Sequence, residues 1–341
     1  MTEKIIHTAD VHLSSEYPER LEAFKQILDI CEEEADYLVV SGDLFDANTD
    51  LEDLKTDLRP LLSDNSFETL VIPGNHDKGA FREDDYLGDS VTVLNERPFQ
   101  SFETEDYNIV GVPYTDESFS DLSDKLSEGF VEGKDNVLLL HCTLQGASGG
   151  FGEEEEYMPV RPDELVKTGF DYVLGGHIHS MAVRKKFQGT VFAYPGSPAS
   201  VSSTETGPRY IWKHGEEGLS TVELNSFHYI SRDIEILPGE EEDVIDYLNS
   251  SLSEASSQAC ALVNVSGFTE RNVEEMMEKL TEAVEDQGLE IRLNDEGLES
   301  VSSIVDSELY TEFIERLDEK DTEDENEIEK KFLRALSRHE R

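Results

Sequence analysis

Five short apolar runs in this chain each lead into side chains that can ligate a metal ion. They occupy residues 5–12, 38–43, 71–77, 137–141 and 173–179. Short runs rich in Val, Ile and Leu are typical of buried strands, and stacked α/β sheets bind ligands at the carboxyl ends of their strands. Each run carries Asp, Asn or His at that end, so the sequence predicts one site assembled from several strand ends.

The candidate ligands share an oxygen or imidazole donor, and none is a thiolate. They are Asp10, His12, Asp43, Asn75, His141, His177 and His179. This donor set suits Mn²⁺, Fe²⁺ or Zn²⁺ and disfavours a cysteine-type structural zinc site. Taken alone, His141 would more often be a buried histidine satisfied by hydrogen bonds, so the hypothesis rests on the convergence of several strand ends.

The spacing of the ligands suggests how the site works. Asp10 and His12 are two residues apart, and so are the histidines of the last run. We expect each pair to project from one side of an extended segment, because strand side chains alternate with a period of two. The carboxylate of Asp43 has two oxygens and can bridge two metals. Two cations roughly 3.5–4 Å apart clamp a phosphate during in-line displacement, so the pattern favours phosphoester hydrolysis.

His76 directly follows Asn75. If Asn75 ligates through its carbonyl oxygen, His76 points elsewhere and is free to protonate a leaving oxygen. We expect Asp77 to orient either the turn or His76. His7 lies inside the first predicted strand and is interpreted as a packing residue.

The chain is strongly acidic, with 77 acidic and 28 basic residues and a formal net charge of -49. Such a charge normally argues against nucleic acid as a partner. A folded, dispersedly acidic chain is also typical of proteins that work in very high salt, where the Debye length falls to about 3 Å at 1 M. We therefore expect a protein of a halophilic archaeon, for which DNA remains an allowed partner.

Cysteine usage and the chain termini suggest a compartment. Cys31, Cys142 and Cys260 are scattered and form no Cys-x-x-Cys pair, which indicates a reducing environment. The sequence shows neither a charged-then-apolar leader nor a membrane-spanning apolar stretch. We expect a cytoplasmic protein with no membrane association.

Three segments differ in character. Residues 1–228 hold every ligand run and are predicted to form the catalytic α/β domain. A Gly-rich and acidic stretch at residues 145–156 is predicted to form a surface loop beside the site. Residues 229–300 predict a small β-α-β-α-β unit, interpreted as a capping domain. Residues 301–341 form a charged tail with two weakly amphipathic helices. The last helix is locally basic through Lys330, Lys331, Arg334, Arg338 and Arg341.

The five runs resemble the signature of the calcineurin-like metallophosphoesterase superfamily, namely Asp-x-His, Gly-Asp, Gly-Asn-His-Asp, His and Gly-His-x-His. The resemblance spans residues 5–198. Within the superfamily the chain is most similar to the SbcD and Mre-eleven DNA-repair nucleases. The similarity lies in residues 7–12, 42–46, 141–148, 176–179 and 194–198. It implies a four-layer α-β-β-α sandwich followed by a capping domain and a helical C-terminal tail.

The resemblance also implies roles for the ligands. One metal would be held by Asp10, His12, Asp43 and His179. The other would be held by Asp43, Asn75, His141 and His177. His76 would be the catalytic histidine. At Asp46 the chain matches the SbcD branch, since the Mre-eleven branch usually has a histidine there.

The same resemblance implies two Mn²⁺ ions, phosphodiester hydrolysis in DNA during double-strand break repair, and a homodimer. Its implied partner is an SMC-like coiled-coil ATPase that the C-terminal helices would contact. The alternative for these helices is that they fold back on the protein.

Three functions compete at this point: a DNA exonuclease or endonuclease, a metallophosphoesterase for a small phosphodiester or phosphomonoester, and a non-enzymatic scaffold that keeps the metal site. The capping unit and the separate tail favour the nuclease, because an enzyme for small substrates needs neither. His76 argues against the scaffold, because a structural metal site has no use for an unligated histidine beside Asn75.

Overall fold

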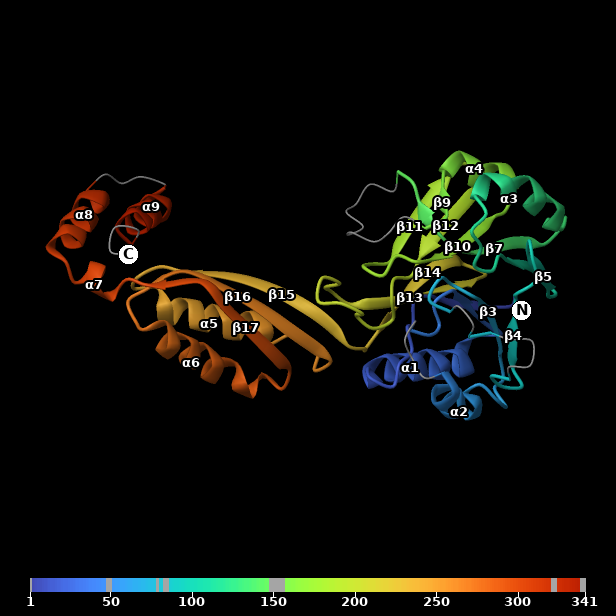
Figure 1. Ribbon diagram of the computed structural model, residues 1–341, viewed down its shortest axis with the longest axis horizontal. Helices are drawn as coiled ribbons and strands as arrows, with labels where there is room; N and C mark the ends of the chain where they lie inside the picture. The colour runs from blue at the N-terminus through green and yellow to red at the C-terminus, as the bar shows by residue number, and fades with distance from the viewer. Residues whose placement is uncertain are drawn as a thin grey trace. The chain divides into compact units, whose positions relative to one another are not determined.

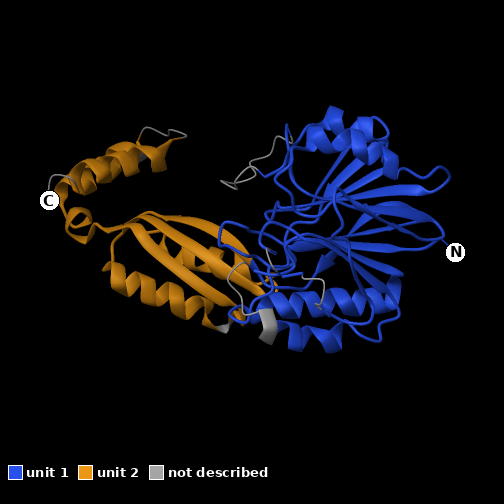
Figure 2. Cartoon of the chain, turned by 45° about the vertical axis from the view of Figure 1, so that its right-hand side comes forward, with its two compact units in different colours: residues 1–228 blue, residues 229–341 orange. Residues whose placement is uncertain are grey.

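The computed structural model describes residues 2–46, 51–77, 80–81, 86–146, 157–319 and 324–337. The chain divides into two compact units, Met1–His228 and Tyr229–Arg341, which Figure 2 draws in blue and orange. Most of the surface loop expected at residues 145–156 lies outside the described residues, and so do the basic Arg338 and Arg341.

The first sheet of unit 1 is six-stranded, in the order β14-β13-β1-β2-β3-β4. Its parallel part consists of β1 (Ile5–Thr8), β2 (Tyr37–Ser41), β3 (Glu68–Ile72) and β4 (Val91–Val93). The antiparallel strands β13 (Arg209–Gly215) and β14 (Gly218–Leu224) extend it on the side of β1. Three of the five ligand runs therefore enter one sheet as parallel neighbours.

The second sheet is also six-stranded, in the order β11-β12-β10-β7-β6-β5. Its parallel strands are β6 (Tyr107–Gly111), β7 (Asp135–His141), β10 (Tyr172–Gly176) and β12 (Thr190–Tyr194). Its edges are the antiparallel β5 (Gln100–Glu103) and β11 (Val183–Phe187). A small parallel pair, β8 (Thr143–Leu144) with β9 (Pro159–Val160), follows β7. The remaining two ligand runs end on the neighbouring strands β7 and β10.

Helices cover the outer face of each sheet (Figure 1). On the first sheet lie α1 (Pro18–Glu34) and α2 (Leu51–Leu61), with Phe24 and Ile27 among the buried side chains. On the second lie α3 (Phe119–Leu126), the 3₁₀ turn η1 (Ser127–Gly129) and α4 (Pro162–Thr168).

A separate apolar core fills the space between the two sheets and contains Val39, Leu70 and Leu139. The strands are apolar on both faces because both faces are covered. The predicted four-layer α-β-β-α sandwich is confirmed.

Unit 2 contains a three-stranded sheet in the order β15-β16-β17. Its elements are β15 (His228–Ile236), α5 (Glu241–Leu252), β16 (Ala259–Thr269), α6 (Val273–Val284), the 3₁₀ turn η2 (Glu285–Gln287) and β17 (Glu290–Ser300). Ile236, Leu248 and Leu280 pack in its core. Both helices contribute to this one core, so the sheet buries one face against them.

Three short helices end the described chain, α7 (Ser302–Val305), α8 (Glu308–Asp318) and α9 (Glu325–Ser337). Ile304 and Leu333 are buried in one cluster with Leu237 and Phe268. The tail helices therefore pack through their apolar faces against Leu237 and Phe268 of the same unit, as the fold-back alternative expects. None of the described helices has both the length and the apolar character needed to cross a membrane.

Candidate metal centre

The five ligand runs end at the carboxyl ends of parallel strands. Thr8, Ser41 and Ile72 are the last residues of β1, β2 and β3 in the first sheet, and the candidate ligands follow them. In the second sheet His141 is the last residue of β7, and His177 follows the end of β10. Because the two sheets stack face to face, side chains far apart in the sequence meet here.

The local conformation differs from the extended pairs expected from the sequence. Strand β1 ends at Thr8, and Asp10 and His12 have φ values of 54° and 48°. Asp43 and His177 also adopt positive φ, 52° and 99°. The alternation argument was therefore wrong, because left-handed loop residues aim these side chains. Such residues cost on the order of 1–3 kcal/mol each and persist only where the surroundings fix them.

The structure brings the candidate ligand atoms into two overlapping groups. One group contains Asp10, His12 and His179, and the other contains Asp10, Asp43 and His141, with the ligand atoms of each group within 4.8 Å of one another. Nε2 of His12 lies 3.1 Å from Nε2 of His179. Each group combines residues from both sheets, so the cluster depends on how the sheets stack.

Asp43 belongs to the second group and also approaches His12 of the first. Its Oδ2 is 3.2 Å from Nε2 of His141 and 3.9 Å from Nε2 of His12. Its Oδ1 accepts a hydrogen bond from the backbone N–H of His76 at 2.8 Å. Its position fits a bridging carboxylate.

The other two candidates lie beside His141. Oδ1 of Asn75 is 2.8 Å from Nε2 of His141. The ring of His177 has its centroid 5.3 Å from that of His141, and its backbone N–H donates to both carboxylate oxygens of Asp10 at 2.9 Å. All seven predicted ligands thus gather at one place.

The donor chemistry of the cluster fits divalent metal ions. Nδ1 of His141 lies 3.0 Å from the carbonyl oxygen of Ser41. Because a carbonyl only accepts, Nδ1 carries a proton, and Nε2 would turn its lone pair toward Asp43 and Asn75 once a metal displaces its own proton. Burial lowers the pKa of His12 well below its ordinary value, so its ring is neutral. Buried lone pairs that face one another repel unless a cation lies between them.

The pKa shifts of the candidate ligands also favour a divalent cation at this site. Burial raises the pKa of Asp10 to about 6. Burial would lower the pKa of His141, but the carboxylates of Asp43 and Asp10 outweigh it and raise the value to about 9. Burial would likewise raise the pKa of Asp43, and His141 holds it below the ordinary range instead. The negative potential that retains a proton here is the potential that attracts a divalent cation.

His76 lies beside the ligands and differs from them in exposure. Its side chain is exposed, and its ring meets that of His12 edge-on at a centroid distance of 4.9 Å. Asp77 is buried and accepts hydrogen bonds from the backbone N–H groups of Gly74 at 2.8 Å and Phe45 at 2.9 Å. Of the two roles considered for Asp77, these contacts support orienting the turn.

Glycines allow the loops to approach this closely. A Cβ atom at Gly74 would lie 2.2 Å from Oδ1 of Asp43, and one at Gly42 would lie 2.3 Å from Nδ1 of His141. Gly42 also has a φ of 90°. Larger residues at these positions would displace two of the candidate ligands.

Several supporting residues escaped the sequence analysis. The guanidinium of Arg20 donates through one nitrogen to the carbonyl oxygen of His12 at 2.9 Å and to Oδ2 of Asp46 at 2.8 Å. Asp46 thus braces the loop of His12 through Arg20. The ring of Tyr157 lies 5.8 Å, centroid to centroid, from both His141 and His177. Arg20 and Tyr157 stand in no motif, and only the fold places them near the centre.

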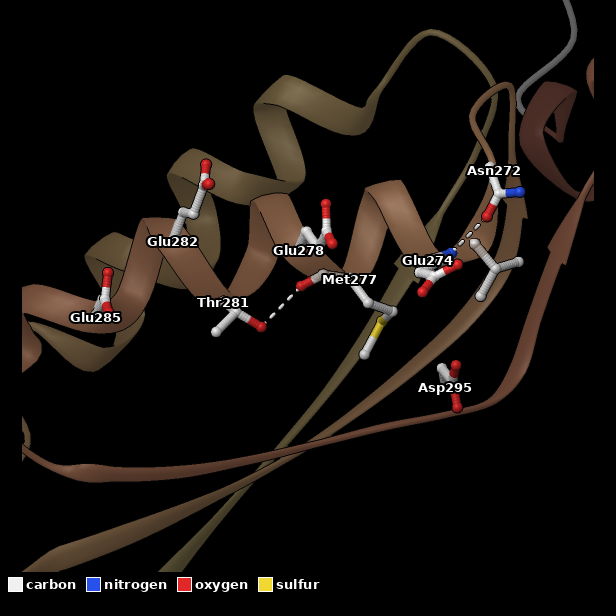
Figure 3. Close-up of a pocket in the computed structure, with 9 residues that line it drawn as sticks. Asn272, Glu274, Met277, Glu278, Thr281, Glu282, Glu285 and Asp295 are labelled. Carbon is white, nitrogen blue, oxygen red and sulfur yellow. Dashed lines mark hydrogen bonds between the residues drawn. The ribbon is translucent and has the colours of Figure 1, made fainter.

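A hollow of about 950 Å³ is lined by residues of unit 2 (Figure 3). Glu274, Glu278 and Glu282 of α6 line it together with Asp295 of β17. Its lining offers acidic and apolar side chains without histidine or cysteine, and we assign it no chemistry.

Residues 3–181 match the family model of the calcineurin-like phosphoesterases. The chain belongs to this family. As a calcineurin-like phosphoesterase it is a metal-dependent hydrolase with candidate ligands for two metal ions.

Two curated proteins are similar to this phosphoesterase. The "Uncharacterized metallophosphoesterase YhaO" of Bacillus subtilis is 27% identical over 249 residues, which cover 65% of this chain and 60% of that protein. The "DNA double-strand break repair protein Mre11" of Saccharolobus solfataricus is 29% identical over 213 residues, covering 57% of this chain and 54% of that protein. The chain matches little more than half of each relative's length.

Among solved structures, a dimetal phosphatase from Danio rerio superposes with a TM-score of 0.41 at 10% identity. The match covers 65% of this chain and 98% of that one.

Proposed function

We propose that this phosphoesterase is a two-metal-dependent DNA nuclease, an exonuclease or endonuclease acting in double-strand break repair. The observation that carries the proposal is the position of Asp43. Its Oδ2 lies 3.9 Å from Nε2 of His12 and 3.2 Å from Nε2 of His141, which belong to different ligand groups, and the exposed His76 lies beside it. The similarity to an archaeal Mre11 repair protein supports DNA as the substrate.

The ligand sets follow from this geometry and from the family signature. Asp10, His12, Asp43 and His179 would hold one metal, and Asp43, Asn75, His141 and His177 would hold the other. The mixture of carboxylate, amide and imidazole donors suits Mn²⁺. When bound, two such ions supply charge stabilisation for the phosphoryl group and a nucleophile derived from water at neutral pH.

The chain's own residues would perform the remaining steps. His76 is exposed beside the ligands and would donate a proton to the leaving oxygen of the sugar. Its backbone N–H holds Oδ1 of Asp43, which fixes the distance between the acid and the ligands. The aromatic ring of Tyr157 covers His141 and His177 and would limit the access of water on that side.

The remaining segments are assigned roles within the same proposal. Residues 1–228 would form the nuclease domain, residues 229–300 a capping domain, and residues 301–341 a tail that contacts an SMC-like ATPase in a homodimer. The tail helices bury most of their apolar residues within unit 2, so the exposed Leu309 and Ile328 are the candidates for a partner. The net charge of -49 and the three buried free cysteines support a reducing, high-salt cytoplasm.

The deciding experiment is Mn²⁺-dependent degradation of linear double-stranded DNA in concentrated KCl, run beside the small ester bis-p-nitrophenyl phosphate. The variants are Asp43→Ala and, as a control, Asp29→Ala, which removes an exposed carboxylate of α1. We expect the wild type and Asp29→Ala to cleave both substrates and Asp43→Ala to cleave neither.

The second candidate is a phosphoesterase for a small phosphodiester or phosphomonoester, which the family membership alone permits. Cleavage of the small ester without DNA, both in isolation and with a coiled-coil ATPase added, would support this candidate and overturn the nuclease. Cleavage of DNA that needs the ATPase would keep the nuclease.

A further inference from the structure

We propose that Glu205 is a positioning residue that fixes His179 in the orientation and tautomer required for metal binding. The inference rests on the proposed two-metal site and adds a residue to it. Glu205 comes from the loop between β12 and β13, outside all five ligand runs.

Glu205 contacts the imidazole of His179 on the side away from the other ligands. Its Oε1 lies 3.3 Å from Nδ1 of His179. The opposite nitrogen, Nε2, lies 3.1 Å from Nε2 of His12 and 3.9 Å from Oδ1 of Asp10. The ring therefore stands between the carboxylate of Glu205 and the candidate metal position.

The other oxygen of Glu205 accepts two hydrogen bonds, and the backbone N–H among the two donors can only donate. Oε2 accepts from the backbone N–H of Val201 at 2.8 Å and from Oγ of Ser197 at 3.1 Å. The side chain is buried, with 5% of its surface exposed. The carboxylate is thus locked in place and available to the ring through Oε1.

The same loop also grips the backbone of His179. Its carbonyl oxygen accepts from the N–H of Ser197 and from the guanidinium of Arg209, each at 3.1 Å. Arg209 in turn donates to the carbonyl oxygen of Glu205 at 2.8 Å. The main chain and the ring of His179 are therefore held by this loop together with Arg209, the first residue of β13, which leaves the ring little freedom to rotate.

This arrangement decides which nitrogen can bind a metal. A carboxylate only accepts, so it retains the proton on Nδ1 and leaves the lone pair on Nε2, where the cluster converges. Carboxylate partners of this kind orient a ligating histidine and raise its basicity. Losing one typically costs about 10–100-fold in metal affinity.

Replacing Glu205 by glutamine should reverse the preference of His179 for the tautomer with its proton on Nδ1. The amide oxygen of Gln must face the fixed N–H of Val201, so its NH₂ group faces Nδ1 of His179. That donor favours the tautomer with the proton on Nε2, which blocks the nitrogen that faces the metal position. The volume of the side chain stays the same, so the change tests hydrogen-bond polarity without opening a cavity.

The test compares wild type, Glu205→Gln, Glu205→Asp and a control, Glu164→Gln. Glu164 is a similarly buried carboxylate of unit 1 that accepts the N–H of Arg161 at 3.1 Å, on α4. Two measurements are made on full-length protein. Nitrogen-15 NMR of the histidine rings reports the tautomer of His179 without metal, and Mn²⁺ titration followed by electron paramagnetic resonance reports the affinity of each metal.

We expect Glu205→Gln to move the proton of His179 to Nε2. The affinity for one of the two Mn²⁺ ions should fall by about 10–100-fold, and the affinity for the other should stay unchanged. Glu205→Asp should keep the wild-type tautomer, and Glu164→Gln should match the wild type in both measurements. A wild-type tautomer and two unchanged affinities in Glu205→Gln would overturn the inference and leave the nuclease intact. A wild type that binds no Mn²⁺ would overturn the two-metal function and this inference with it.

Discussion

The backbone N–H of His76 donates to Oδ1 of Asp43 at 2.8 Å, so the two residues are tied together although 33 positions separate them. This bond attaches the proposed proton donor to the proposed bridging ligand. The next residue back, Asn75, turns its side chain toward His141 instead.

These adjacent residues should respond differently to substitution. His76→Ala keeps every ligand and the backbone N–H, so it should retain Mn²⁺ binding while losing about 10²–10⁴-fold in turnover. Asn75→Ala removes a ligand and should weaken Mn²⁺ binding as well. Isothermal titration of Mn²⁺ beside hydrolysis of bis-p-nitrophenyl phosphate separates the two effects. Wild-type turnover in His76→Ala would refute the catalytic assignment.

A methyl group at Gly74 should disrupt the centre from the backbone side. The added Cβ would lie 2.2 Å from Oδ1 and 2.5 Å from the backbone nitrogen of Asp43, so Gly74→Ala must push that loop away. We expect Mn²⁺ binding to be lost and the melting temperature to fall. Gly189→Ala is the matched control, because a Cβ there meets nothing within 4 Å. Equal Mn²⁺ affinity in both variants would contradict the close packing described.

Stability should fall in acid because of His7. This histidine of β1 is buried, neither ring nitrogen has a hydrogen-bond partner among the described residues, and burial lowers its pKa to about 3. The unfolded chain takes up a proton below about pH 6.5 while the folded chain stays neutral, so stability is lost as the pH falls from about 6.5 toward 3.

The free energy of unfolding lost by about pH 3 is on the order of 4 kcal/mol. His7→Leu should flatten this acid dependence, as measured by chemical unfolding between pH 4 and pH 8. An unchanged slope would show that His7 does not titrate in this way.

The C-terminal helices should contribute to the stability of unit 2. Leu333 of α9 is fully buried against Leu237 and Phe268, whereas 55% of Leu309 of α8 is exposed. Leu333→Ala should cost about 2–5 kcal/mol, and Leu309→Ala less than about 0.5 kcal/mol. Thermal unfolding of the full chain measures both. If Leu309→Ala alone abolished binding of a coiled-coil ATPase, the proposed partner surface would be supported.

The sequence predicted the elements of the site better than its local geometry. Each ligand run was recognisable because an apolar strand followed by Asp, Asn or His is a local pattern. The positive φ values of Asp10 and His12 could not be recognised in the sequence, because nothing in Asp-Val-His distinguishes a left-handed loop from an extended segment. The four-layer fold was implied by the resemblance to the family signature, whereas the apolar runs by themselves predicted only buried strands in an α/β domain.

The supporting contacts were beyond sequence reasoning for a different reason. His12 and His179 are 167 residues apart, and Glu205 reaches His179 only after the chain has returned from β12. Their proximity depends on how the two sheets stack, which hydrophobic periodicity does not specify. Arg20 and Asp46 likewise meet across 26 residues without any recognisable spacing.

The division of the ligands between the two sheets has a consequence for the whole domain. Asp10, His12, Asp43 and Asn75 follow strands of one sheet, and the three remaining histidines end or follow strands of the other. A cation held by both groups acts as a crosslink across the inter-sheet core that contains Leu139. Because the unfolded chain has no such site, every bound ion adds to the free energy of unfolding in proportion to the logarithm of its concentration. Chelation would thus lower the free energy of unfolding of the sandwich itself. The supply of metal in the cell would set what fraction of the domain is folded.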